Sequence, residues 1–571
     1  MTSTGFLFDR LMPHLILAPI ALPLLTAGLM LLLREERQRT KVTLNITSTL
    51  VGLVVAVLLL VQAKEPSVQT SLGVYLPGNW PAPFGIVLVI DRLSAMMLVL
   101  TSTVALATVL FSAARWHRAG VHFHPLFQFQ LMGLAGAFLT ADLFNLFVFF
   151  EIMLAASYGL LLHGSGRPRV SAGLHYIAIN LAASSLFLIG VSMLYGITGT
   201  LNMADLARSI AGVASTDRGL LHAACAILGV AFLIKAALWP LNFWLVPAYS
   251  AATAPVGALF ALMTKVGVYV ILRLWTLLFS PDAGPSAQFG SAWLVGGGMV
   301  TMAFGAVGML GSQRLGHLAG FAAISSSGTL LAAVGMGHNQ LTGGLLYYLL
   351  SSTVAVSALF LLTDLIERWR NDGFSVAPYE RKDDAPFLSA DLVHSASAPL
   401  DDDEQEVIGE VIPAAAAFLG LAFITCTLVV AGLPPLSGFI GKFALIHALL
   451  NPLGLGAAGA PVAMSSWVMV GLMLVSGLFA LVALTRVGVL HFWSAHDRAA
   501  PKLLVMEGLP VALLVLMCAA LAWKAGPVLR YTEATANALH APAGYIRAVM
   551  SAQPVPNPTA APTESQQESR P

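Results

Sequence analysis

The stretch LGVAFLIKAALWPLNFWLVPAYSAATAPVGALFALMTKVGVYVILR, from Leu228 to Arg273, holds two lysines inside segments that are otherwise apolar enough to cross a bilayer. The segment between Lys235 and Lys265 contains three prolines, Pro240, Pro247 and Pro255. A charged side chain at the bilayer centre costs roughly 3 kcal/mol on insertion scales, and such residues usually face a bundle interior or a water-filled path. Interrupted membrane helices are also where transporters place ion sites. The stretch therefore predicts a membrane protein that moves protons or cations.

The composition indicates that nearly the whole chain lies in a bilayer. Of its 571 residues, 57% are hydrophobic and only 10% are charged, whereas a soluble domain has about 25% charged residues. The formal net charge of +1 gives no sign of a nucleic-acid partner. Three dispersed cysteines form no disulfide or metal-ligand pattern. We expect the first apolar run to be a retained span rather than a removed signal peptide.

Apolar runs long enough to span a bilayer recur along the chain, and we count about 14 of them. They lie near residues 14–33, 43–62, 85–113, 125–140, 143–163, 171–197, 219–238, 255–279, 289–311, 317–337, 342–365, 411–451, 466–486 and 508–526. The run at 411–451 is too long for one span, and Pro434 and Pro435 interrupt it. We therefore predict an all-α integral membrane protein with broken helices.

The loops between these runs alternate in charge. Every second loop is basic, beginning with residues 34–41, except the uncharged loop at 239–254, and the intervening loops contain few lysines or arginines. The positive-inside rule then places both termini outside. Residues 201–211 (LNMADLARSIA) are amphipathic and predict a short surface helix. Residues 369–410 predict a solvated connector, and the tail at 551–571 predicts disorder.

Lys235 and Glu151 are the first candidates for chemistry. Each stands among apolar neighbours with no opposite charge adjacent in sequence. Desolvation disfavours the charged form of a lysine, so Lys235 could release its proton and act as a relay. A buried carboxylate needs a partner, and a pair of Glu151 with Lys235 would satisfy both groups. The alternatives are a lysine that extends to the membrane interface and a purely structural ion pair.

Lys265 and Lys442 complete the predicted proton relay. Lys265 lies inside an apolar run, and Lys442 follows the Pro-Pro interruption, which repeats the design around Lys235. An interfacial or loop-end lysine is the alternative for each of them. Four weaker candidates are more often structural or interfacial residues at such places, namely Asp142, His175, His317 and Thr353.

Signatures of soluble enzymes are missing from the sequence. There is no phosphate-binding GxxxxGK[ST] loop, no HExxH and no haem-attachment CxxCH. We therefore predict no cofactor and no metal site.

Several segments together resemble the large antiporter-like subunits of multisubunit cation/proton antiporters, known as Mrp, Mnh or Pha. These in turn are similar to proton-pumping membrane subunits of respiratory complex I and of membrane-bound hydrogenases. The matching segments are ADLFNLFVFFE at 141–151, LHYIAIN at 174–180, LYGITGTLN at 194–202, Lys235 with the PxxxWLxPA segment at 240–248, Ala254-Pro255 leading to Lys265, and GLPPLSGF at 432–439 with Lys442. They cover roughly residues 85–486, and the lysine at 442 resembles the D-type member of the Mrp family.

The resemblance implies two inverted five-helix repeats. The corresponding division of the chain is N-terminal helices at 1–113, a first repeat with the Lys265 helix at 114–279, a second repeat with its broken helix at 280–451, C-terminal helices at 452–550 and a tail at 551–571. Between Lys265 and Lys442 this chain has fewer charged groups than many relatives. Water, His317 or a chain of hydroxyls would have to bridge that interval.

We accordingly expect a proton-translocating subunit of a multisubunit Na⁺ or K⁺/proton antiporter in the bacterial inner membrane. Its expected partners are the other hydrophobic subunits, of A/B, C, E, F and G types, together with protons, Na⁺ or K⁺ and membrane lipid. One alternative is a pump subunit of a complex I-like or hydrogenase complex. A structural scaffold with inactive lysines is another.

Overall fold

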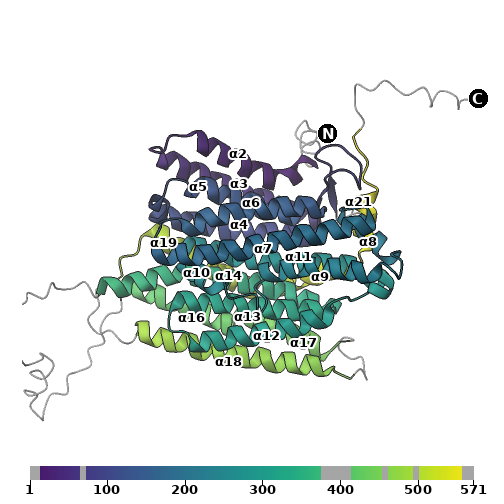
Figure 1. Ribbon diagram of the computed structural model, residues 1–571. Helices are drawn as coiled ribbons and strands as arrows, with labels where there is room; N and C mark the ends of the chain where they lie inside the picture. The colour runs from purple at the N-terminus through teal and green to yellow at the C-terminus, as the bar shows by residue number, and fades with distance from the viewer. Residues whose placement is uncertain (1–12, 65–71, 374–412, 453–460, 493–500, 556–571) are drawn as a thin grey trace, which may run out of the picture.

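The computed structural model describes residues 13–64, 72–373, 413–452, 461–492 and 501–555, and these residues are mostly helical (Figure 1). The elements of the first half are η1 (Pro13–Leu17), α2 (Ala18–Leu32), α3 (Gln38–Lys64), β1 (Gly73–Tyr75), β2 (Leu88–Ile90), α4 (Arg92–Ala114), η2 (Trp116–Ala119), α5 (Phe123–Leu139), α6 (Leu143–Leu162), α7 (Arg167–Thr198), α8 (Met203–Ala211), α9 (Arg218–Lys235), α10 (Leu245–Ala251) and α11 (Ala254–Leu278). Those of the second half are η3 (Pro281–Ser286), α12 (Ser291–Gly311), α13 (Leu315–Met336), α14 (Asn339–Gly373), α16 (Ala414–Ala431), α17 (Ser437–Leu450), α18 (Met464–Phe492), α19 (Val505–Trp523), α20 (Ala525–His540) and α21 (Ala543–Met550).

The predicted membrane spans are confirmed. Within the described part of the chain, 13 helices are long and apolar enough to cross a membrane. Helix α5, with 17 residues, occupies the remaining predicted run. The long run at 411–451 is divided into α16 and the shorter α17, as the Pro-Pro interruption predicts. The all-α membrane fold is therefore confirmed, while the inverted repeats and the domain boundaries stay predictions.

The predicted span at 85–113 begins too early. Residues Leu88–Ile90 form strand β2, which pairs antiparallel with β1 through Val74 and Val89. Helix α4 starts only after Asp91, whose carboxylate accepts a hydrogen bond from the backbone N–H of Ser94, 2.8 Å away. A side chain that caps a helix in this way fixes its first turn. The capping residue therefore sets the start of α4, and the apolar residues before it become a strand.

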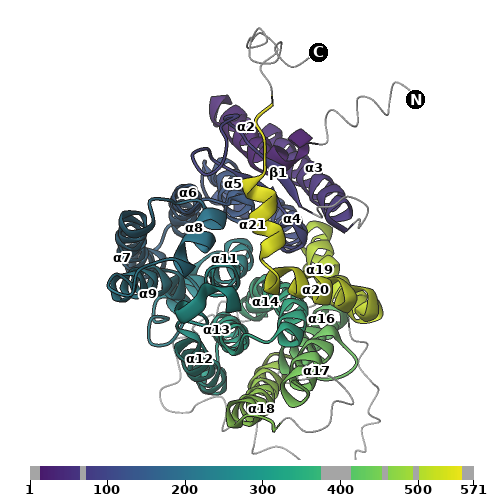
Figure 2. The same cartoon turned by 90° about the vertical axis from the view of Figure 1, so that its right-hand side faces the viewer.

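Helices α11, α13 and α14 form the centre of the bundle. The most apolar windows of α11 and α14 are completely buried, and that of α13 is almost so. Viewed along the helices, the three lie inside a ring of outer helices (Figure 2). Small residues permit close packing of membrane helices. Gly298 of α12 is an example, because it faces the backbone of α13. A Cβ on Gly298 would lie 2.3 Å from the backbone nitrogen of Ala332 in α13.

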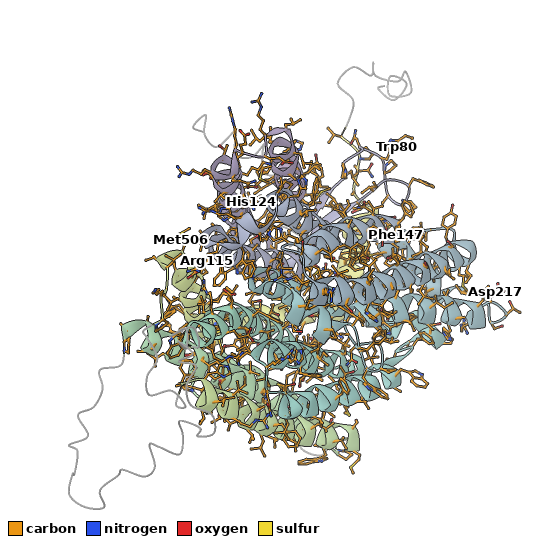
Figure 3. The ribbon with its side chains drawn as sticks, turned by 60° about the vertical axis from the view of Figure 1, so that its left-hand side comes forward. Trp80, Arg115, His124, Phe147, Asp217 and Met506 are labelled. Carbon is orange, nitrogen blue, oxygen red and sulfur yellow. The ribbon has the colours of Figure 1, made fainter. Side chains whose placement is uncertain are left out.

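The two ends of the bundle differ. Arg115, from a basic loop, and Asp217, from a poorly basic one, lie at opposite ends (Figure 3). Helices α20 and α21 cross the Asp217 end of the bundle (Figures 1 and 2). The predicted short helix is α8, capped by Asn202, whose side chain accepts from the N–H groups of Ala204 and Asp205. Most of the predicted connector and of the predicted disordered tail lies outside the described residues.

Candidate functional site

The predicted interruption between Lys235 and Lys265 is confirmed. Helix α9 ends at Lys235 itself, and the backbone then turns through Ala237, which has a φ of +57°. The short helix α10 follows, and α11 begins beside Pro255, which occupies the first turn of the helix. A proline is tolerated there because the first N–H groups of a helix have no intrahelical partner. The break thus places Lys235 at a helix end inside the bundle.

Lys235 is held by an amide on α7. Its side chain is buried, with 7% of the residue exposed, and Nζ donates to Oδ1 of Asn180 at 3.1 Å. Nδ2 of Asn180 donates to the carbonyl of Tyr176 at 2.8 Å, which orients the amide oxygen toward the lysine. Nζ also lies 5.9 Å from the centre of the Phe150 ring, a distance at which a ring face attracts a cation. Lys235 therefore does not extend to the membrane interface.

Glu151 is held by a residue of α7, the helix that also carries Asn180. Its carboxylate on α6 accepts a hydrogen bond from the hydroxyl of Ser184. Asn180 and Ser184 are four residues apart on α7 and so share one face of it. Glu151 and Lys235 form no ion pair within 4.0 Å in the structure, so the predicted direct pair is not formed. The two groups instead contact two polar residues on one face of α7, Lys235 through Asn180 and Glu151 through Ser184.

Lys265 is the most deeply buried of the predicted lysines. It lies in the middle of α11 with 1% of the residue exposed. Nζ donates to the hydroxyl of Ser326 at 2.5 Å and to that of Ser327 at 3.2 Å, both on α13. Hydroxyl oxygens can accept from an ammonium group and donate onward to another acceptor. The lysine at the centre of the bundle is therefore solvated by serines rather than by a carboxylate.

Lys442 binds the end of the other broken helix. Its Nζ donates to the carbonyl oxygens of Ala431 at 2.8 Å and Val430 at 3.3 Å, which are the last residues of α16. A cation is favourable at a helix C-terminus, where carbonyl groups lack intrahelical partners. Gly432 adopts a φ of +81°, and a Cβ there would lie 2.4 Å from Cδ of Lys442. Glycine is favoured here because the backbone is left-handed, and a Cβ would also force the lysine side chain to shift.

A small cavity joins the surroundings of Lys265 to those of Lys442. It has a volume of about 20 Å³, enough for about one water molecule. Its polar lining comes from Ser325 and Ser326 of α13, Tyr348 and Ser352 of α14, Lys442 of α17 and Ser476 of α18. Ser326 thus contacts Lys265 and also lines the cavity that reaches Lys442. The interval that the sequence leaves without charges contains hydroxyl groups and space for water.

We predict that Ser326→Ala slows proton transport by at least about tenfold, because a hydrogen bond to a charged group contributes about 1.5–3 kcal/mol. The matched control is Ser327→Ala, which removes the longer hydrogen bond to Lys265 and does not alter the lining of the cavity. We expect this control to be impaired much less. Proton flux into vesicles that contain the assembled complex measures both, and equal rates for the two variants would contradict the prediction.

The two histidine candidates meet at one large cavity. His175 of α7 and His317 of α13 both line a space of about 770 Å³. Arg314, Glu367, Arg370 and His491 also line it, as does Trp244 from the break between α9 and α10. Most of these residues, Trp244 excepted, lie near the helix ends next to the basic loops. We call this space the basic-face cavity, and it makes both histidines candidates for proton entry rather than for the central relay.

Asp142 and Thr353 have local structural contacts. Asp142 caps α6 and accepts from the N–H of Asn145 at 2.8 Å, and burial raises the pKa of its carboxyl group. The hydroxyl of Thr353 donates to the carbonyl of Leu349 in its own helix at 2.6 Å. Thr353 does not line the small cavity, whereas its neighbour Ser352 does. The hydroxyl groups that contact Lys265 therefore come from α13, which sequence reasoning did not single out.

Together, the buried lysines, the two broken helices and the cavities define a polytopic membrane protein built to move ions. Residues 140–381 match the family model described as NADH:quinone oxidoreductase/Mrp antiporter, transmembrane. The chain belongs to the family of D-type subunits of Mrp multisubunit antiporters. It is 52% identical over 543 residues to the D-type subunit of a probable K⁺/H⁺ antiporter of Rhizobium meliloti, covering 94% of this chain and 98% of the relative.

Other relatives and solved structures agree with this assignment. The D-type subunit of an Na⁺/H⁺ antiporter of Alkalihalophilus pseudofirmus is 32% identical, with 94% of this chain and 100% of the relative covered. A chain of the Mrp complex from Dietzia superposes with a TM-score of 0.76 at 25% identity, over 94% of this chain and 99% of that chain. A chain of respiratory complex I from Thermus thermophilus superposes with a TM-score of 0.68 at 21% identity, over 94% of this chain and 100% of that chain, and shares the fold.

Proposed function

We propose that this chain is the proton-translocating subunit of a multisubunit monovalent cation/proton antiporter in a bacterial inner membrane. The observation that carries the proposal is a series of lysines inside the bundle, at the two helix breaks and between them, each bound to neutral polar groups. Lys235 and Lys265 are buried, and Lys442 is half-buried. Lys235, Lys265 and Lys442 contact an amide, two hydroxyls and two carbonyls respectively. Such neutral partners stabilise an ammonium group less than a carboxylate would, so proton release costs less.

The proposed route begins at the basic-face cavity. Protons pass Glu151 and Lys235, which α7 links through Ser184 and Asn180, and continue to Lys265. They then reach Lys442 across the small serine-lined cavity. By the positive-inside rule, the basic loops favour an entrance on the cytoplasmic side and both termini outside.

Potassium is the first cation to test. The relative described as a K⁺/H⁺ antiporter subunit shares 52% of its residues with this chain, and the relative described as an Na⁺/H⁺ antiporter subunit shares 32%. The chain itself has few carboxylates within its spans, so we assign cation movement to the complex as a whole. We infer that the chain has no catalytic activity of its own and acts as a transporter subunit.

The test is proton flux in vesicles that carry the complete complex, driven by a K⁺ or an Na⁺ gradient. We expect coupled flux with the wild type, and a loss of about tenfold or more with Glu151→Gln, which removes the charge and preserves the shape of the side chain. Glu533→Gln is the control, because Glu533 is an exposed carboxylate on α20. An absence of flux coupled to either cation in the assembled wild type would overturn the proposal.

A further inference from the structure

Several buried polar atoms close to the first break have no hydrogen-bond partner among the described residues. They are the hydroxyls of Tyr158, Tyr249 and Thr253, Nε1 of Trp244 and Nδ2 of Asn242. A buried polar group without a hydrogen bond costs about 1–3 kcal/mol, and native proteins usually satisfy such groups with ordered water. Five of them in one region therefore indicate bound water.

Three of these side chains form a continuous aromatic cluster with Tyr176. Ring centres are 5.6 Å apart for Tyr158 and Tyr176, 5.3 Å for Tyr176 and Trp244, and 5.9 Å for Trp244 and Tyr249. The hydroxyl of Tyr176 is paired with that of Ser157 at 2.8 Å. We call Tyr158, Tyr176, Trp244 and Tyr249 the aromatic cluster.

The aromatic cluster lies between the basic-face cavity and the first relay groups. Trp244 lines that cavity. Tyr176 precedes Asn180, the partner of Lys235, by one turn of α7, and its carbonyl accepts from the Asn180 amide. Tyr158 follows Glu151 by seven residues on α6, which places the two side chains on one face two turns apart. The cluster therefore extends from the cavity to the faces of α7 and α6 that carry Asn180 and Glu151.

We propose that the aromatic cluster binds a short chain of ordered waters, through which protons pass from the basic-face cavity to Glu151 and Lys235. This inference rests on the proposed function. Each hop breaks one O–H bond of a hydrated proton and forms one on the next water, and the last proton is accepted by the Glu151 carboxylate. The tyrosine hydroxyls and the indole N–H are positioning groups, because they hold the waters in line by hydrogen bonds and keep their own protons. An indole N–H can only donate, so Trp244 binds its water through the water oxygen.

Water at the cluster can be measured without transport. Hydroxyl radicals generated from water by X-rays label side chains beside bound water even when they are buried, and mass spectrometry locates the label. Tyr249 and Tyr347 are matched, with 1% and 0% of each residue exposed. The hydroxyl of Tyr347 donates to the carbonyl of Leu521 at 2.9 Å, whereas that of Tyr249 is unpaired. We expect strong labelling of Tyr249 and little of Tyr347 in the assembled complex, and equal labelling would overturn the water chain.

The same two tyrosines give a transport test. Tyr249→Phe removes no hydrogen bond within the protein, and Tyr347→Phe removes one. A purely structural role therefore predicts greater damage from Tyr347→Phe. We expect the reverse, with antiport lowered about tenfold by Tyr249→Phe and unchanged by Tyr347→Phe. If both variants match an active wild type, the water chain is overturned and the proposed function stands. If the wild type shows no antiport, it is the proposed function that fails.

Discussion

Antiport by the assembled complex should fall below detection when Lys235 is replaced by methionine. Methionine is unbranched and similar in length, so it can fill the same space next to Asn180 and Phe150. It cannot carry a proton, and its thioether cannot donate to the Asn180 amide. In the proposed route Lys235 stands between Glu151 and the central Lys265, so its loss should interrupt every proton transfer that uses this route.

Proton flux driven by a K⁺ gradient in vesicles is the measurement, with the amount of assembled complex determined on the same membranes. Lys524→Met provides the control, because Lys524 is an exposed lysine at the end of α19. It should transport at the wild-type rate. Normal antiport in an assembled Lys235→Met complex would contradict the relay and support a scaffold with inactive lysines.

The sequence was sufficient to predict the helix breaks and the lysines beside them, for physical reasons. Prolines clustered within a short apolar stretch disfavour a continuous helix, and a lysine among apolar residues has few stable positions in a bilayer. Both signals are local, since they depend only on residues close to Lys235 or Lys442. The structure accordingly agrees with the sequence at α9–α11 and at α16–α17.

The partners of these lysines could not be predicted, because they depend on which helices become neighbours. Asn180 of α7 is 55 residues away in sequence from Lys235, which it contacts. Ser326 of α13 is 61 residues away from Lys265. Two polar residues four positions apart on an apolar span, such as Asn180 and Ser184, are a signal that can be read from sequence. It identifies a polar face of the helix but does not identify the residue that this face contacts.

Arg273 shows the same limit. It stands near the end of an apolar run, where an arginine can extend to the interface, yet it is buried with 8% of the residue exposed. Its guanidinium makes two hydrogen bonds to Asp91, of 2.6 and 2.8 Å, and packs 5.4 Å from the centre of the Tyr545 ring. Because Asp91 caps α4, its pair with Arg273 connects α11 to α4. The contact of Arg273 with the Tyr545 ring connects α11 to α21.

We expect Asp91→Asn to lower the free energy of unfolding by about 3–5 kcal/mol, because removal of one partner leaves an uncompensated buried charge. Burial raises the pKa of Asp91, but Arg273 and the hydrogen bonds from Ser94 outweigh it, so this pKa lies below its ordinary value of 3.8. A carboxyl group with a lowered pKa stabilises the fold above its ordinary range, and that contribution is lost as the pH falls through the folded-state pKa. The pair is therefore fully formed at neutral pH.

Thermal unfolding of the purified complex, followed at neutral pH, measures this effect. The control is Asp217→Asn, which changes an exposed aspartate whose side chain does not cap α9, and it should leave the unfolding temperature unchanged. A second substitution distinguishes the buried charge from lost packing. Adding Arg273→Met to Asp91→Asn removes the unpaired guanidinium, and replacing both members of a buried pair is often close to neutral, so stability should recover in part. If the double variant is less stable than Asp91→Asn alone, the loss comes from packing around Arg273 and Tyr545 rather than from the unpaired charge.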